Sequence, residues 1–280
     1  MNELKPLLKD LIFPEGPRWH DGKLWFSDMH AHTVCTVDLG GKQQVITEVA
    51  AWPSGLGWLP DGRLLIVAMT ERKVLRLEGG QLKVHADISG LASFHCNDMV
   101  VDGVGRAYVG NFGYDLLSDA PKKPAELVMV NPDGSARIVA DGLDFPNGTV
   151  VTPDGKTLIV GESMGHRLTA FDIAGDGGLS NRRLFADLGE GVPDGIALDA
   201  ENAIWVASPL NKELLRVKQG GAVTDRLKCD SMPIACALGG ASRQTLFVLF
   251  ADSIHPEECR AQKSSRIDTM EVAVPGVGWP

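Results

Sequence analysis

One pattern of apolar and polar residues recurs along the whole chain. Each copy has a short apolar run, a turn that contains glycine, a second apolar run, a polar gap and a third apolar run. Runs of this kind indicate short β-strands, because amphipathic helices would show a period of 3.6 residues and these segments do not. The copies begin at Glu15, Ser54, Asn97, Asn147, Asp194 and Ala235.

The spacing of the copies identifies the fold. They start roughly 40 to 50 residues apart, which is the length of a four-stranded propeller blade. Asp-Gly pairs at residues 21–22, 61–62 and 154–155 are strong hairpin signals. We therefore predict an all-β, six-bladed β-propeller of four-stranded antiparallel blades, as a single domain over residues 1–280. Segment 266–275 is predicted to be an outer strand that closes the ring with the N-terminal segment, because an open ring would leave exposed strand edges.

The strand order within a blade predicts which segments share one mouth of the central channel. The first strand lies nearest the axis, so the residues that open the six copies should ring one opening. The second hairpin of each blade returns to that opening, and its loop should roof it. The six loops are residues 28–32, 69–72, 111–124, 163–166, 209–212 and 251–263. Two of them, 111–124 and 251–263, are long enough to act as lids.

Charge and cysteine content narrow the expected partners. The formal net charge is −9 and no run of Lys or Arg occurs, whereas phosphate binding needs clustered basic residues. No apolar stretch approaches the roughly 18 residues that cross a bilayer, and the charges within residues 1–11 argue against a signal peptide. The five cysteines form no C-x-x-C pair, which favours reduced thiols in the cytoplasm. We expect a small-molecule substrate, no nucleic acid or membrane partner, and a monomer or weak homo-oligomer.

Four of the six ring positions carry side chains with oxygen ligands: Glu15, Asn97, Asn147 and Asp194. Two carboxylates close to one axis repel each other and are costly to bury unpaired, and a divalent cation removes both problems. Carboxylate and amide oxygens suit Ca²⁺ first, with Mg²⁺, Mn²⁺ or Zn²⁺ as alternatives. The competing interpretation is that each residue only opens its strand and bonds to nearby backbone. A cation that merely holds the ring together is a further alternative.

Several motifs resemble one known family. They are FPEGPRW with LWFSD, NDMVVD with GRAYVGN, FPNGTVVTPDGKTL, and VPDGIALD, and the resemblance runs from Phe13 to the C-terminal VPGVGWP. The chain is thereby similar to the senescence marker protein / gluconolactonase / luciferin-regenerating enzyme family of regucalcin-like lactonase propellers. The resemblance implies a metal held by Glu15, Asn147 and Asp194, with Asn97 beside it as a further ligand or a substrate contact. It also implies hydrolysis of lactones with Asp194 as general base.

One position departs from the family pattern. Sugar-lactonase members carry Arg two residues before the Asn that matches Asn97, and here that position is His95. The change removes a permanent charge and a forked donor, so a less polar lactone or ester becomes the expected substrate. We predict that the substrate is contacted by His95, Asn97, Phe112, Tyr114 and Met164. We also expect an apolar mouth, formed by Phe94, Trp52, Phe112, Tyr114 and Met164.

The expected reaction is metal-assisted hydrolysis of a cyclic ester. The cation would polarise the carbonyl, and Asp194 would accept a proton from the attacking water unless the cation activates that water directly. Asn97 would orient the lactone, while Asp98 would either support the site from behind or simply be a strand-end carboxylate. The same metal propeller could instead run a lyase, isomerase or dehydratase step on a carbonyl compound. A non-catalytic cation-binding propeller is the third alternative.

Two local patterns are interpreted as structural. Gly161–Gly165 matches G-x-S-x-G, but a strand pattern follows it where a nucleophile elbow needs a helix, so we predict a hairpin turn. His30 and His32 could bind metal, yet a polar hairpin tip is the expected role.

Overall fold

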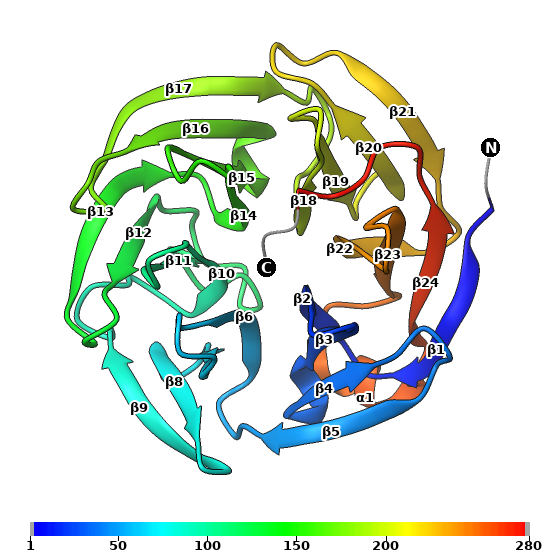
Figure 1. Cartoon of the computed structure of the whole chain (residues 1–280), viewed down its shortest axis with the longest axis horizontal. Helices are drawn as coiled ribbons and strands as arrows, with labels where there is room; N and C mark the ends of the chain where they lie inside the picture. The colour runs from blue at the N-terminus through cyan, green and yellow to red at the C-terminus, as the bar shows by residue number, and fades with distance from the viewer. Residues whose placement is uncertain (1–2, 278–280) are drawn as a thin grey trace.

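The computed structural model describes residues 3–277, and it confirms the predicted six-bladed propeller. Six antiparallel four-stranded sheets surround a central axis, with β2, β6, β10, β14, β18 and β22 innermost (Figure 1). In the first three blades the strands are β2 (Pro14–His20), β3 (Lys23–Asp28), β4 (Thr33–Val37), β5 (Gln43–Glu48); β6 (Pro53–Trp58), β7 (Leu64–Ala68), β8 (Lys73–Glu78), β9 (Gln81–Asp87); β10 (Cys96–Val101), β11 (Ala107–Asn111), β12 (Ala125–Val130), β13 (Ala136–Leu143).

The last three blades follow the same order from axis to rim. Their strands are β14 (Pro146–Val151), β15 (Thr157–Glu162), β16 (Arg167–Ile173), β17 (Leu179–Asp187); β18 (Ile196–Leu198), β19 (Ile204–Ser208), β20 (Glu213–Val217), β21 (Val223–Lys228); β22 (Met232–Gly239), β23 (Thr245–Ala251), β24 (Ser265–Glu271), β1 (Lys5–Leu11). Three short helices lie in the connections: η1 (Met29–Ala31), η2 (Ser163–Gly165) and α1 (Pro256–Gln262).

The ring is closed by both ends of the chain. Strand β1 pairs antiparallel with β24, so that Lys5 lies opposite Thr269 and Leu11 opposite Ser265. The predicted closing strand is therefore present, as the third strand of its blade, with the N-terminal strand outside it. This arrangement pairs the inner edge of β1, and the first and last blades meet where β2 packs beside β22.

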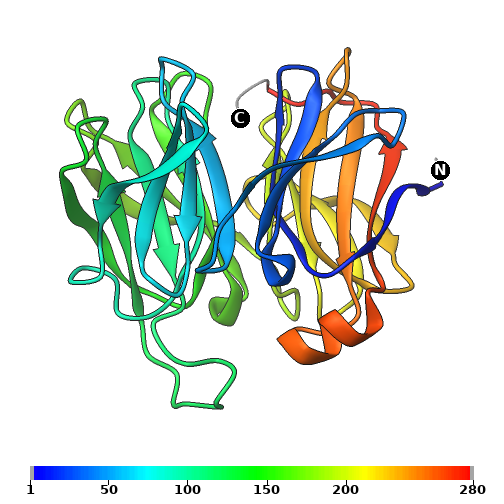
Figure 2. The ribbon, with the colours of Figure 1, turned by 90° about the horizontal axis from the view of Figure 1, so that it is seen from below.

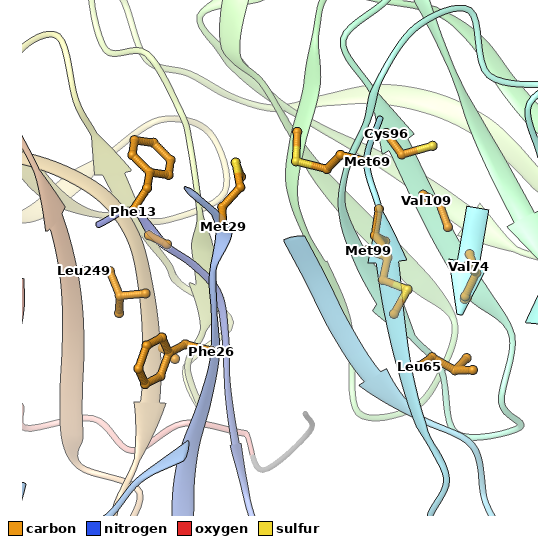
Figure 3. Close-up of a cluster of buried hydrophobic side chains, with 14 of the residues drawn as sticks. Phe13, Phe26, Met29, Leu65, Met69, Val74, Cys96, Met99, Val109 and Leu249 are labelled. Carbon is orange, nitrogen blue, oxygen red and sulfur yellow. The ribbon is translucent and has the colours of Figure 1, made fainter. Parts of the chain in front are cut away.

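Apolar side chains fill the spaces between neighbouring blades. The largest cluster joins blades 1, 2, 3 and 6, and it includes Phe26, Met99 and Leu249 (Figure 3). Figure 3 also shows Phe13 and Met29 on one side of this region, with Met69 and Cys96 on the other. This packing fixes the distances between the inner strands, and those strands carry the ring residues.

The predicted loops gather at one face of the propeller. In Figure 2 helix α1 and the long connection between β11 and β12 project from the same face, while the C-terminal end of the described chain lies at the opposite face. Contacts between α1 and η1 cover part of that mouth. No helix among the described residues is both long and apolar enough to cross a membrane.

Candidate metal centre and catalytic site

All four predicted ligands line one cavity at the axis. Its volume, with the open mouth included, is about 590 Å³. The lining residues are Phe13, Glu15, Met29, His30, Trp52, Met69, Asn97, Phe112, Leu116, Leu117, Phe145, Asn147, Asp194 and Ile254. Of the six predicted roof loops, 28–32, 69–72, 111–124 and 251–263 contribute to this lining. The other two ring positions, Ser54 and Ala235, do not line it.

A break in strand pairing aims several ring side chains at the axis. The ladder between the first two strands shifts register between Glu15 and Arg18 in the first blade and between Cys96 and Met99 in the third. The same shift follows Pro146 in the fourth blade, next to Asn147. Such irregularities bend a strand and redirect its side chains. The ring positions Glu15, Asn97 and Asn147 therefore lie at irregularities near the start of their inner strands, whereas β18, which follows Asp194, pairs with β19 without a register shift.

Glycines beside the ring residues let neighbouring blades approach closely. A Cβ on Gly148, which follows Asn147, would lie 2.4 Å from the backbone oxygen of Asp194. A Cβ on Gly195, which follows Asp194, would lie 2.5 Å from the Ala235 Cβ. Real Cβ atoms do not come so close to other heavy atoms, so only glycine fits at either position. The backbone N–H of Gly148 donates to the Asp194 oxygen at 3.1 Å, which ties the two ligand positions together.

The two carboxylates are electrostatically strained without a cation. Burial raises the pKa of Glu15 well above its ordinary value, and the charges of Asp194 and Asp98 raise it further. Burial also raises the pKa of Asp194 to about 7, against a hydrogen bond from Asn147 that lowers it. Asp194 still exposes part of its surface to the cavity, whereas Glu15 is only 8% exposed. A positive charge between these groups would favour their ionised forms.

The side-chain amides of Asn147 and Asn97 differ in their hydrogen bonding. The Asn147 Nδ2 donates to the Ser163 Oγ at 3.2 Å, and that hydroxyl donates to the Pro193 carbonyl at 2.6 Å. Ser163 lies in η2 between β15 and β16, so the G-x-S-x-G segment is the predicted hairpin turn and its serine orients a ring residue. The Asn97 Nδ2 is buried and has no hydrogen-bond partner among residues 3–277. The Asn97 carboxamide is thus free to turn toward a ligand in the cavity.

A buried ion pair lies beside these groups. The Arg18 Nη2 donates to the Asp98 Oδ1 at 2.8 Å, and the backbone N–H of Met99 donates to the same oxygen at 2.9 Å. Asp98 does not line the cavity, but its charge acts on Glu15 and Asp194. This placement agrees with a supporting position behind the site. Sequence reasoning missed Arg18, because its partner lies 80 residues away in another blade.

The predicted substrate contacts divide into two groups. Asn97 and Phe112 line the cavity, whereas His95, Tyr114 and Met164 are not among its lining residues. The His95 ring stacks on Phe94 with centroids 4.2 Å apart, and burial lowers the pKa of His95, so the ring is neutral at pH 7. Tyr114 is buried against Phe145, and Met164 is half-buried in η2. Substrate contact by these three residues remains a prediction.

His30 lines the cavity, and the prediction that it belongs to a polar hairpin tip was wrong. It is 3% exposed rather than part of a polar hairpin tip, because η1 is covered by the segment that contains α1. Its ring packs between Phe13 and Trp52, with centroids at 5.0 and 4.9 Å. Burial lowers the pKa of His30 to about 4. The described residues contain no cluster of three or more His, Cys, Asp or Glu side chains that could hold a metal, so any cation here depends on the amides as well.

Comparison with known proteins identifies the family. Residues 13–252 match the family described as "SMP-30/Gluconolactonase/LRE-like region". The chain belongs to this family. The resemblance predicted from the motifs is thereby confirmed, and the match covers blades 1 to 5 and the two inner strands of the sixth blade.

Relatives of this SMP-30/gluconolactonase/LRE-like protein include two curated proteins. Regucalcin of Homo sapiens is 26% identical over 255 residues, which is 87% of this chain and 85% of that protein. The 6-deoxy-6-sulfogluconolactonase of Pseudomonas putida is 26% identical over 223 residues, which is 77% of this chain and 75% of that protein. The crystal structure of a calcium-binding protein, regucalcin from Agrobacterium tumefaciens, superposes with a TM-score of 0.80 at 21% identity, covering 99% of this chain and 94% of the other. That likeness supports the propeller fold.

Proposed function

We propose that this protein hydrolyses lactones with a divalent cation held at the propeller axis. The observation that carries the proposal is the convergence of two carboxylates, one buried and one partly buried, and two amides on one cavity. Membership of a family that includes lactonases supports the chemistry, and the calcium-binding relative supports Ca²⁺ as the first candidate cation.

The residues present fit a hard divalent cation. Burial raises the pKa of both Glu15 and Asp194 when no cation lies between them, and the Asn97 Nδ2 has no hydrogen-bond partner among residues 3–277. Glu15, Asn147 and Asp194 would hold the ion, with Asn97 beside it. When bound, the ion would supply a Lewis acid that polarises the lactone carbonyl and stabilises negative charge on its oxygen.

The chain's own residues perform the other tasks. Asp194 accepts a proton from the water whose oxygen attacks the carbonyl carbon, and it returns a proton to the ring oxygen as the C–O bond breaks. Asn97 donates to the substrate and orients it. Asn147 is kept in place by Ser163, and the apolar side chains around the cavity exclude other water molecules. The product is the ring-opened hydroxy acid.

Removal of the cation is the direct test. After chelation we expect no lactone hydrolysis above background, because Glu15 and Asp194 alone cannot polarise the carbonyl. Adding back Ca²⁺, Mg²⁺, Mn²⁺ and Zn²⁺ separately, with a panel of lactones and aryl esters, should restore turnover with at least one ion. If tight cation binding is measured by calorimetry and no substrate is turned over, the hydrolase proposal is wrong and a different carbonyl reaction or a binding role takes its place.

Ser163→Ala should weaken cation binding without disturbing the fold. The change removes the acceptor that fixes the Asn147 amide, and the loss of such a supporting partner typically costs 10- to 100-fold in metal affinity. Calorimetric titration measures the dissociation constant. Ser208→Ala is the control, since the hydroxyl of Ser208, the last residue of β19 in the next blade, bonds to Val192 and Asn211 instead of a ring residue. Equal affinities in both variants would contradict the assigned role.

A further inference from the structure

The cavity has a polar set and an apolar wall. The polar set is Glu15, Asn97, Asn147 and Asp194, as described above. The apolar wall comprises Phe13, Met29, Trp52, Met69, Phe112 and Phe145. Within residues 3–277 no Lys or Arg lines the cavity, so nothing there would pair with a carboxylate or phosphate on a substrate. A wall of this composition binds carbon chains and rings rather than polyhydroxylated molecules.

Apolar side chains continue to the rim of the cavity. Leu117 and Ile254 line it and are 37% and 41% exposed, although one comes from loop 111–124 and the other from loop 251–263. Both side chains border the cavity, so the outer carbons of a bound ligand would lie against them. The apolar environment therefore extends outward from the polar set.

One polar group interrupts the apolar wall. His30 Nδ1 is buried and has no hydrogen-bond partner in the described part of the chain. Burial lowers the pKa of His30 to about 4, so the ring is neutral and one of its nitrogens donates while the other accepts. The backbone of Ile254 favours the protonated ring, and we assign the proton of the neutral ring to Nε2. Nδ1 is then an acceptor without a donor. A buried acceptor of this kind is costly to leave unpaired, and a ligand that brings a donor satisfies it.

We propose that the cavity selects lactones whose hydrophobic substituent of several carbons carries one hydrogen-bond donor, with His30 as the specificity-determining acceptor. The inference rests on the proposed lactonase function and names its substrate class. The lactone ring lies at the polar set, the carbons of the substituent pack against the apolar wall, and the donor bonds to His30 Nδ1. An acylamino lactone has this chemistry, because its amide N–H lies between the ring and the acyl chain.

Two comparisons of substrates test the proposal with the cation-loaded protein. The first is a series of γ-lactones with unbranched alkyl substituents of zero, two, four and six carbons, alongside glucono-δ-lactone. We expect kcat/KM to rise about three- to fourfold for each added methylene until the cavity is filled. The second compares an acylamino γ-lactone with an alkyl γ-lactone of equal chain length. We expect the acylamino substrate to be about tenfold better, the value of one hydrogen bond to an otherwise unpaired acceptor.

Variants assign each preference to its residues. His30→Phe should abolish the acylamino advantage and leave the chain-length dependence intact. Leu117→Ser combined with Ile254→Ser should remove the gain in kcat/KM that the longest alkyl chains bring. The double variant should keep the acylamino advantage. Leu210→Ser is the control, because Leu210 is 75% exposed on loop 209–212 and does not line the cavity. It should change neither preference.

The outcomes separate this inference from the proposed function. If glucono-δ-lactone is the best substrate and alkyl chains bring no gain, the substrate class is wrong while the lactonase function stands. If no lactone is hydrolysed with any cation, the function is wrong. The same alkyl and acylamino lactones are then titrated by calorimetry. If their dissociation constants change neither with chain length nor on His30→Phe, the inference is overturned as well.

Discussion

Asp194→Asn is expected to lower kcat/KM for lactone hydrolysis by about 10²- to 10⁴-fold, the range that a positioned general base contributes. The substitution keeps the size of the side chain but removes its ability to accept a proton, and it also removes one of two negative charges from the cation site. Turnover with saturating cation measures the effect, because saturation separates weaker cation binding from loss of the base.

The fold should survive this change. Burial and neighbouring carboxylates disfavour the charge of Asp194, so the cation-free variant should be no less stable than the parent protein in thermal unfolding. Asp141→Asn removes the same charge from an exposed position in β13 and should leave kcat/KM unchanged. An Asp194→Asn variant within tenfold of the parent activity would remove Asp194 from the mechanism.

Arg18→Met is expected to destabilise the protein by about 3 to 5 kcal/mol, the typical cost of leaving one partner of a buried ion pair alone. Asp98 is 5% exposed, so without Arg18 its charge would remain buried beside Glu15 and Asp194. Urea unfolding of the cation-free protein measures the free energy of unfolding.

A second substitution distinguishes charge from packing. Arg18→Met combined with Asp98→Asn should recover much of the loss, since the stranded charge is gone. Arg183→Met, which breaks the exposed pair between Arg183 and Asp172, should shift the unfolding midpoint little. If Arg18→Met costs less than about 1 kcal/mol, the pair between Arg18 and Asp98 contributes no more to stability than an exposed ion pair.

The regular features of this propeller could be predicted from sequence because they repeat. Six copies of one strand pattern gave the blade number, and the register within each copy placed Glu15, Asn97, Asn147 and Asp194 on one cavity. Single-sequence patterns carry this information because the period of a strand and the length of a blade are local properties.

Features that depend on one loop covering another could not be predicted in this way. His30 has the local sequence of a solvent-exposed turn, and it is buried only because the segment around α1 folds over η1. Similarly, the lining role of Leu117 and Ile254 depends on the paths of the two longest loops. Arg18 and Asp98 meet across two blades, so neither residue identifies the other in sequence.

The pairing of β1 with β24 also sets the order of events as the protein is made. The outermost strand of the sixth blade, β1, emerges from the ribosome before blades 1 to 5, and its partner β24 emerges after them. The two strands lie about 260 residues apart along the chain, so their pairing is a contact of very high sequence separation. The sixth blade cannot be completed before the second of them has been synthesised. Blades 1 to 5 can assemble during synthesis, but the axial cavity acquires its final width only after β24 has been translated.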